Sequence, residues 1–151
     1  MKYTPVQNYI AGKFVDASSV RTMDVISPLD GNLLSSVPMS TAKDLDEAVK
    51  SAKAAFSSWS KTPIKERVQV FFRYKYLLEK NLKELAELCS EENGKTYSES
   101  VAEIEKCVEL TEFACSLPQL VTGEILEVSK GVECRTEHVR TDDASTNFPA
   151  I

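Results

Sequence analysis

The sequence predicts a mostly helical chain that begins with short extended segments and ends with a pair of strands. Residues 62–96 carry the densest helix-periodic apolar pattern, and residues 7–38 form short extended runs around turn-forming residues. Residues 124–139 form two further extended runs joined by a glycine-containing turn. With 151 residues, of which 42% are hydrophobic, the chain is long enough for one domain.

The first forty residues predict a short hairpin followed by two more strands. Gln7–Val15 alternates apolar and polar residues around Gly12, which suits a hairpin. Thr22–Ser27 and Leu33–Pro38 are extended segments, and the Pro28–Gly31 stretch between them has the composition of a tight turn.

The next segment predicts an amphipathic helix from Thr41 to Trp59. Thr41 with Asp44 three residues later has the spacing of a capping box, in which each residue binds the backbone N–H of the other. The apolar residues recur at helical spacing and predict a face that packs against another element. They are Leu45, Ala48, Val49, Ala52, Phe56 and Trp59.

Residues 62–96 predict a long helix with one break. Thr62 followed by Pro63 marks its start, because Pro at the first helical position gives up an amide that would be unpaired there. Asn81, with Glu84 three residues on, predicts a second capped start, so we expect a break near Lys80. The predicted core face comprises Val68, Phe71, Phe72, Leu78, Leu82, Leu85 and Cys89.

Gly94 predicts the end of this helix and Thr96 the start of the next. Glycine takes the left-handed conformation that satisfies the last carbonyls, and Lys95 lies where the helix dipole favours a cation. Thr96 with Glu99 repeats the capping-box spacing and predicts a helix up to Leu117–Pro118. The strand pair that follows, 124–128 and 132–139, cannot persist alone in water and must lie on something.

Composition excludes several classes of partner. The chain has 18 Lys and Arg against 23 Asp and Glu, a net charge of −5, with both signs mixed along the chain. Nucleic acid is therefore not an expected partner. No apolar run approaches the ~20 residues that span a bilayer, and the first residues lack the pattern of a signal or transit peptide. We expect a soluble, cytoplasmic protein with no membrane partner.

The residues that could carry chemistry are few. Four cysteines lack CxxC spacing and predict buried free thiols, with metal binding or disulfides as alternatives. His138 falls in a predicted strand with no Ser or Cys placed for it to activate. The Glu91–Glu92 and Glu103–Glu105 regions predict solvated helix faces. Neither GxGxxG nor GxxxxGK occurs, so no nucleotide-binding loop is predicted. The cysteines are Cys89, Cys107, Cys115 and Cys134.

Four blocks of the sequence resemble the start of NAD(P)-dependent aldehyde dehydrogenases, in the family's order and spacing. These blocks are Tyr9–Val15, Ser27–Gly31, Thr41–Trp59 and Glu92–Thr96. Residues 93–96, 108–115 and 118–123 are most similar to the methylmalonate-semialdehyde dehydrogenase branch, whose members make acyl-CoA.

The resemblance implies an α/β family fold of which this chain is an amino-terminal fragment. Residues 1–122 would be the N-terminal part of the coenzyme-binding domain, 123–139 the strand pair of the oligomerisation arm, and 140–151 an irregular tail. The family uses NAD(P), in some branches with CoA as co-substrate. The dinucleotide sheet, the nucleophilic Cys and the basic Glu come later in the family's chain, so this fragment is expected to bind no cofactor. A homo-oligomer formed through the 124–139 hairpin is expected.

Asn147 is the one residue that the resemblance places at a catalytic position. It begins the Asn147-Phe148-Pro149 sequence, and in the family this Asn donates its amide to the oxyanion, an interaction worth ~3 kcal/mol in such sites. The segment before it, residues 140–146, is polar and shorter than the family's apolar strand. We therefore expect no active role for Asn147 in this chain.

Two function classes remain open from the sequence. The first is the N-terminal portion of an enzyme that oxidises a small aldehyde or semialdehyde with NAD(P), the fragment itself being inactive. The alternative is a non-catalytic helical oligomerisation protein derived from that family.

Overall fold

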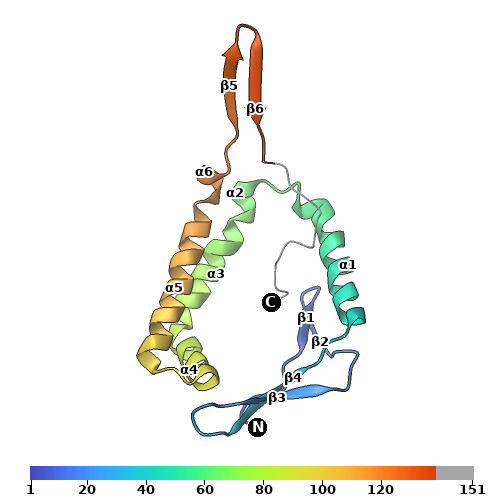
Figure 1. Ribbon diagram of the computed structural model, residues 1–151, viewed down its shortest axis with the longest axis vertical. Helices are drawn as coiled ribbons and strands as arrows, with labels where there is room; N and C mark the ends of the chain where they lie inside the picture. The colour runs from blue at the N-terminus through green and yellow to red at the C-terminus, as the bar shows by residue number, and fades with distance from the viewer. Residues whose placement is uncertain (139–151) are drawn as a thin grey trace.

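The computed structural model describes residues 1–138 of the chain (Figure 1). Asn147 and the 140–151 tail lie outside the described residues. The strands and helices in order are β1 (Asn8–Ile10), β2 (Lys13–Val15), β3 (Thr22–Ile26), β4 (Leu33–Pro38), α1 (Ala42–Trp59), α2 (Ile64–Arg67), α3 (Gln69–Lys80), α4 (Leu82–Asn93), α5 (Tyr97–Cys115), α6 (Leu117–Leu120), β5 (Glu124–Ser129) and β6 (Val132–Thr136).

The described strands form three separate antiparallel pairs, β1–β2, β3–β4 and β5–β6. All three pairs lie where the sequence predicts them. The N-terminal residues run beside β4, since the amide of Tyr3 donates to the carbonyl of Leu34 at 2.8 Å and the amide of Val6 to Ser36 at 2.9 Å. The mostly helical fold with hairpins at each end is therefore confirmed.

Two of the three predicted capping boxes, at Thr41 and Thr96, start a helix. At α1, the backbone N–H of Thr41 donates to the Asp44 carboxylate at 2.7 Å. At α5, the backbone N–H of Thr96 donates to Glu99 at 3.0 Å, and the amide of Glu99 donates to the Thr96 hydroxyl at 3.4 Å. These bonds satisfy amides that the first helical turn leaves without partners.

The break near Lys80 is confirmed, but its predicted mechanism is wrong. The side-chain amide of Asn81 donates to the carbonyl of Leu77 at 2.8 Å, so Asn81 closes α3 and does not cap α4 with Glu84. Its backbone adopts φ −105°, ψ 15° at the junction, which turns the chain between the two helices. Pro63 precedes the first helical residue, Ile64, instead of occupying the first helical position.

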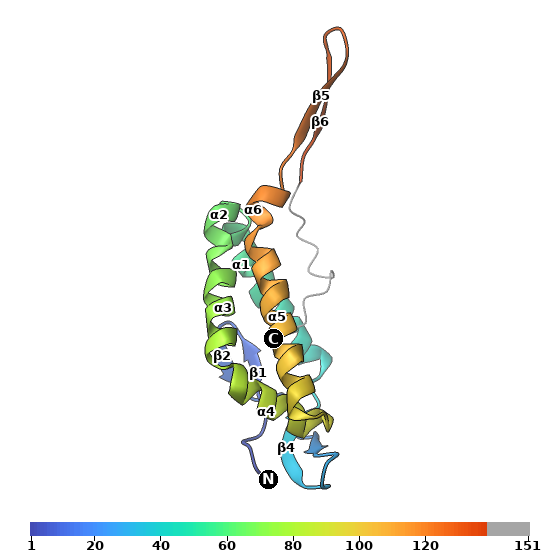
Figure 2. The ribbon, with the colours of Figure 1, turned by 90° about the vertical axis from the view of Figure 1, so that its left-hand side faces the viewer.

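Helix α5 packs along α3 and across α4 (Figure 2). Ala86 on α4 and Ser100 on α5 have no exposed surface, because their small side chains allow the two helices to approach closely. Leu78 on α3 and Thr111 on α5 are buried, and Lys75 of α3 forms an ion pair with Glu112 of α5 at 3.3 Å. The packed part of the helical region lies at these contacts.

Several residues predicted to lie in a core are exposed. Phe72 is 50% exposed, and the apolar stripe of α1 is largely uncovered. The buried apolar residues of the described chain are Leu34, Val68, Leu78 and Ala86. The reason is spatial: α1 packs against β1 and stands apart from the α3–α5 pair in Figure 1, so no element of residues 1–138 faces its stripe. No helix within residues 1–138 is long and apolar enough to cross a bilayer.

Candidate functional site

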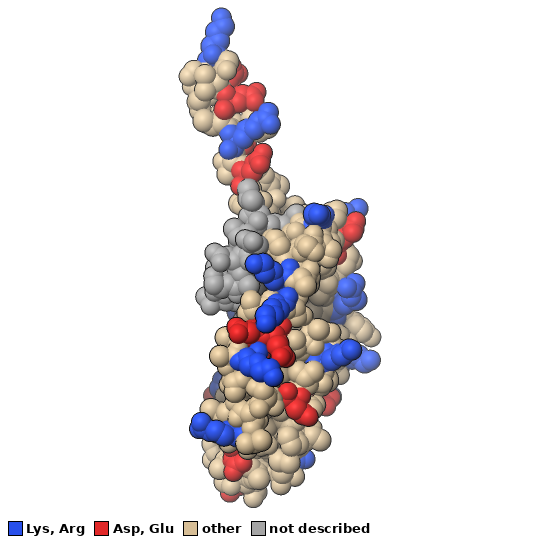
Figure 3. Space-filling model, turned by 90° about the vertical axis from the view of Figure 1, so that its right-hand side faces the viewer, with Lys and Arg blue, Asp and Glu red and all other residues tan. Residues whose placement is uncertain are grey.

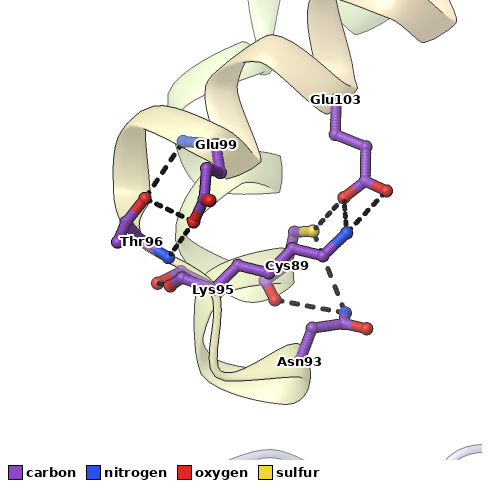
Figure 4. A network of polar contacts seen from close by, with 7 residues as sticks. Cys89, Asn93, Lys95, Thr96, Glu99 and Glu103 are labelled. Atoms are coloured by element: carbon purple, nitrogen blue, oxygen red, sulfur yellow. Dashed lines mark hydrogen bonds and ion pairs between the residues drawn. The ribbon is translucent and has the colours of Figure 1, made fainter.

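The most densely connected polar group lies where α4 ends and α5 begins (Figure 4). Lys95 follows Gly94 at the turn, and its ammonium donates to both oxygens of Glu103 at 2.8 and 2.7 Å. The thiol of Cys89 donates to Glu103 at 3.3 Å, and the amide of Asn93 donates to the carbonyl of Cys89 at 3.2 Å. Side chains from α4, the turn and α5 therefore converge on one carboxylate.

The hydrogen bonds in this group favour the charged forms of the Glu103 carboxylate and the Lys95 ammonium. The ammonium of Lys95, and then the thiol of Cys89, hold the pKa of Glu103 below its ordinary value. The same ion pair raises the pKa of Lys95. A general base or acid works best when its pKa lies near the operating pH, and both shifts move away from neutrality. The group is suited to holding the α4–α5 turn and not to moving a proton.

A second set of contacts joins this turn to the N-terminal strands. A Cβ added at Gly94 would lie 2.9 Å from Cγ of Pro28, so the β3–β4 turn sits directly on the end of α4. Lys2 pairs with Glu91, and the hydroxyl of Tyr3 donates to the other Glu91 oxygen at 2.8 Å. Lys2, and then Tyr3, lower the pKa of Glu91.

An open depression of about 710 Å³ lies beside these contacts. Its two carboxylates are already engaged, Glu91 with Lys2 and Asp30 with the amides of Asn32, which lower the pKa of Asp30. The depression therefore offers no free carboxylate. It is lined by Met1, Lys2, Ser27, Leu29, Asp30, Asn32, Leu33, Leu34 and Glu91.

The other candidate residues do not form a site. All four thiols are free; Cys107 and Cys134 are exposed and Cys89 and Cys115 only partly covered, so the prediction of buried thiols is wrong for the first two. Residues 1–138 contain no group of three or more His, Cys, Asp or Glu that could hold a metal ion. His138 lies beyond the end of β6 instead of within a strand. Asn147 lies outside the described residues.

The β5–β6 hairpin projects from the helices at the end opposite β3 and β4 (Figure 1). Every residue of both strands is exposed, including Ile125 and Leu126 at 65% each. Glu127 lies opposite Glu133, a like-charge pair that weakens the isolated hairpin. A two-stranded hairpin with this much exposed apolar surface is typical of an element that pairs with another chain.

Charge on the surface is mixed. In Figure 3, basic and acidic groups are interspersed along the face turned to the viewer instead of gathering into one patch. Nucleic-acid interfaces concentrate basic side chains on one face. This view gives no support to such a partner.

The helices and hairpins of the described residues have the arrangement of part of an aldehyde dehydrogenase fold. The model of the aldehyde dehydrogenase family matches residues 14–140, and the chain belongs to this family. The family resemblance that the sequence carries is confirmed.

Several similar relatives are named as semialdehyde dehydrogenases. Malonate-semialdehyde dehydrogenase 1 of Geobacillus thermodenitrificans is 43% identical over 129 residues, which cover 85% of this chain and 27% of the relative. The methylmalonate-semialdehyde dehydrogenase of Oceanimonas doudoroffii superposes with a TM-score of 0.83 at 31% identity, covering 89% of this chain and 28% of that structure. A Sinorhizobium meliloti structure assigned to the same activity and solved with NAD gives a TM-score of 0.82 at 34% identity, with the same coverage of 89% and 28%. The chain thus spans about a quarter of the length of these relatives.

The meeting of the two turns was not predicted from the sequence. Pro28 and Gly94 each belong to a block that carries the family resemblance, but the sequence gives no sign that they touch. Lys2 with Glu91 and Cys89 with Glu103 likewise join residues far apart in the sequence. The one signal that could have indicated such a contact is the glycine of a block. A glycine can be required both because its φ is positive and because a neighbouring residue lies too close for a side chain.

Proposed function

We propose that this chain forms the N-terminal structural portion of an NAD-dependent malonate- or methylmalonate-semialdehyde dehydrogenase and is catalytically inactive by itself. The observation that carries the proposal is its superposition on about a quarter of such an enzyme. In the described residues, Glu91 and Glu103 near the α4–α5 turn are each paired with a lysine, and the thiol of Cys89 donates to a Glu103 carboxylate that Lys95 already holds. The proposed reaction of the whole enzyme is oxidation of the semialdehyde with NAD, with CoA or water accepting the acyl group.

The proposed cofactors belong to the longer chain. NAD would bind to a dinucleotide fold that needs a parallel sheet and a phosphate loop, whereas the described strands form only antiparallel pairs. This fragment is therefore expected to bind neither NAD nor CoA. The cytoplasmic location expected from the sequence stays a prediction.

The proposed contribution of the fragment is to shape the subunit contact. The 124–139 hairpin would pair with the same hairpin or with other strands of a second subunit, giving a homo-oligomer. This is supported by the exposure of both strands and by their unpaired edges, which can add to another sheet. The same observation supports the alternative of a non-catalytic oligomerisation protein.

The catalytic part of the proposal is tested by calorimetry and by NAD reduction with malonate and methylmalonate semialdehyde, each with and without CoA. The isolated chain should show no heat of NAD binding at micromolar concentration and no turnover. The Geobacillus relative serves as the positive control. Turnover that disappears on replacing any of the four cysteines by Ser would overturn the proposal.

The association part is tested by light scattering at micromolar concentration. Leu126→Pro or Val128→Pro should shift the chain toward monomer, because proline removes a ladder donor from a pairing strand. Val20→Ser is the control, since Val20 is 99% exposed and lies outside the hairpin. A monomer at every concentration, unchanged by these substitutions, would show that the hairpin has no partner.

A further inference from the structure

Strand β6 presents an edge that pairs with nothing within residues 1–138. It is hydrogen-bonded to β5 on one side only, and every residue from Val132 to Thr136 is exposed. The hairpin projects away from the helices, so no other element of the described chain lies along this edge (Figure 1). An open strand edge offers a row of unpaired N–H and C=O groups that can add to a strand of another chain.

The sequence of β6 is complementary to itself in one antiparallel register. When a second copy of β6 runs antiparallel with Cys134 opposite Cys134, Glu133 of each copy lies opposite Arg135 of the other. No other antiparallel register places Glu133 opposite Arg135, and parallel in-register pairing would place Glu opposite Glu and Arg opposite Arg. Opposite charges directly across a strand pair stabilise it, whereas like charges destabilise it. Charge therefore selects this register from all others.

The other strand of the hairpin lacks this property. The charged residues of β5 are Glu124 and Glu127, so no register of β5 against a second β5 brings opposite charges together. Within the hairpin, Glu127 lies opposite Glu133, and Arg135 is the only basic residue of the two strands, 3.3 Å from Glu133. This face of the hairpin therefore holds two carboxylates for one guanidinium, and Arg135 of a second copy would supply another.

We infer that two copies of this chain associate through the outer edges of their β6 strands, antiparallel and with the two-fold axis at Cys134. The inference rests on the proposed association through the hairpin, and it names the strand and the register. A Glu133–Arg135 ion pair lies on each side of the axis. The occupant of the edge is a second copy, because the complementarity is that of β6 with itself.

This register brings two thiols within reach of each other. Directly opposite residues of antiparallel strands have Cα atoms ~4.5–5.5 Å apart, within the ~4.4–6.8 Å that a disulfide spans. Oxidised glutathione should therefore join Cys134 to Cys134 of the second copy by thiol–disulfide exchange. The two thiols are oxidised to one protein disulfide, and the glutathione disulfide takes up their two electrons and two protons and leaves as two molecules of glutathione.

Cys107 is the matched control, because it is also exposed and lies on α5 instead of at the axis. Non-reducing electrophoresis and mass spectrometry of the linked peptides give the rate at each cysteine. We expect the Cys134–Cys134 linkage to form roughly tenfold faster than any linkage through Cys107, because association raises the effective concentration of the two Cys134 thiols. Linkage through Cys107 at an equal rate, or the absence of a Cys134–Cys134 linkage, would overturn the inference.

Charge reversal tests the register without the cysteine. Arg135→Glu and Glu133→Arg each turn two attractive pairs into two repulsive ones, and each should weaken dimerisation roughly tenfold in sedimentation. The double variant Glu133→Arg with Arg135→Glu restores complementarity and should restore the dimer. Glu133→Arg is the decisive variant, since it removes the like-charge pair with Glu127 and so stabilises the hairpin itself. A dimer strengthened by Glu133→Arg, or a double variant no tighter than the single ones, would overturn the inference.

The proposed function and this register fail in different ways. Turnover by the isolated chain refutes the catalytic proposal and leaves the register unaffected. A monomer at every concentration refutes association through the hairpin, and the register with it. A dimer that neither responds to the charge reversals nor forms the Cys134–Cys134 linkage refutes the register alone.

Discussion

Replacing Gly94 by Ala should destabilise the chain more than the same change at Gly31. The two glycines have nearly the same backbone, with φ +72° and +73°, so alanine pays the left-handed penalty of ~1–2 kcal/mol at both. They differ in the space around them. A Cβ at Gly94 would lie 2.9 Å from Cγ and 3.4 Å from Cβ of Pro28, whereas a Cβ at Gly31 meets nothing within 4 Å.

The contact with Pro28 sets the size of the difference. Overpacking at a site whose neighbour is a stiff ring costs ~1–3 kcal/mol. We therefore expect a loss of ~2–5 kcal/mol for Gly94→Ala and ~1–2 kcal/mol for Gly31→Ala. The double variant Gly94→Ala with Pro28→Ala should recover most of the difference, because it removes the ring atom that the new methyl meets.

Urea unfolding followed by far-ultraviolet circular dichroism measures these free energies. The comparison requires equal m-values for the variants, so that a change in midpoint is a change in stability. Equal losses at the two glycines would refute the reasoning, because the β3–β4 turn would then not rest on α4. A double variant that is no more stable than Gly94→Ala alone would also refute the contact between Pro28 and position 94.

Three further predictions concern the helices. Leu78→Ala should cost ~2–5 kcal/mol and Phe72→Ala less than ~1 kcal/mol in urea unfolding, since Leu78 is buried and Phe72 half exposed. Thr96→Ala should lower the unfolding free energy by ~1 kcal/mol through loss of the capping box, and Thr96→Ser should retain most of it. The pKa of Glu103 is depressed in the folded chain, so its contribution to stability is complete above the ordinary value of 4.5 and is lost as the pH falls through the folded value. The urea midpoint between pH 7 and 3 should therefore fall less steeply in Lys95→Met than in the parent chain.

Elements fixed by neighbouring residues could be predicted from the sequence. The boxes at Thr41 and Thr96 and the stop at Gly94 each depend on atoms within a few residues, so the pattern contains the whole interaction. Asn81 is a position where the sequence allows two outcomes. Its side-chain amide group can hydrogen-bond to the end of the preceding helix or to the start of the following one, and in the structure it donates to the carbonyl of Leu77. The sequence predicts that a break occurs there but not which end is capped.

Contacts between distant residues could not be predicted in this way. Lys95 was expected to compensate the dipole of α4, yet its ammonium lies on Glu103 of α5. That pairing depends on how the turn between α4 and α5 directs the Lys95 side chain along α5. The candidate site is therefore a product of packing, and only the turn residues within it were evident beforehand.

The mistaken burial of Phe72 and of the α1 stripe has a different origin. Helical periodicity identifies which face of a helix is apolar, and it does so correctly for α1, whose stripe residues keep their spacing. It does not identify what lies opposite. Among the described residues, α3 has α5 beside it and buries Leu78, while α1 packs against β1 and leaves Trp59 exposed. Because an apolar face gains its free energy only when another surface covers it, the same pattern stabilises α3 within the chain and contributes little at α1, whose face is uncovered within the described residues.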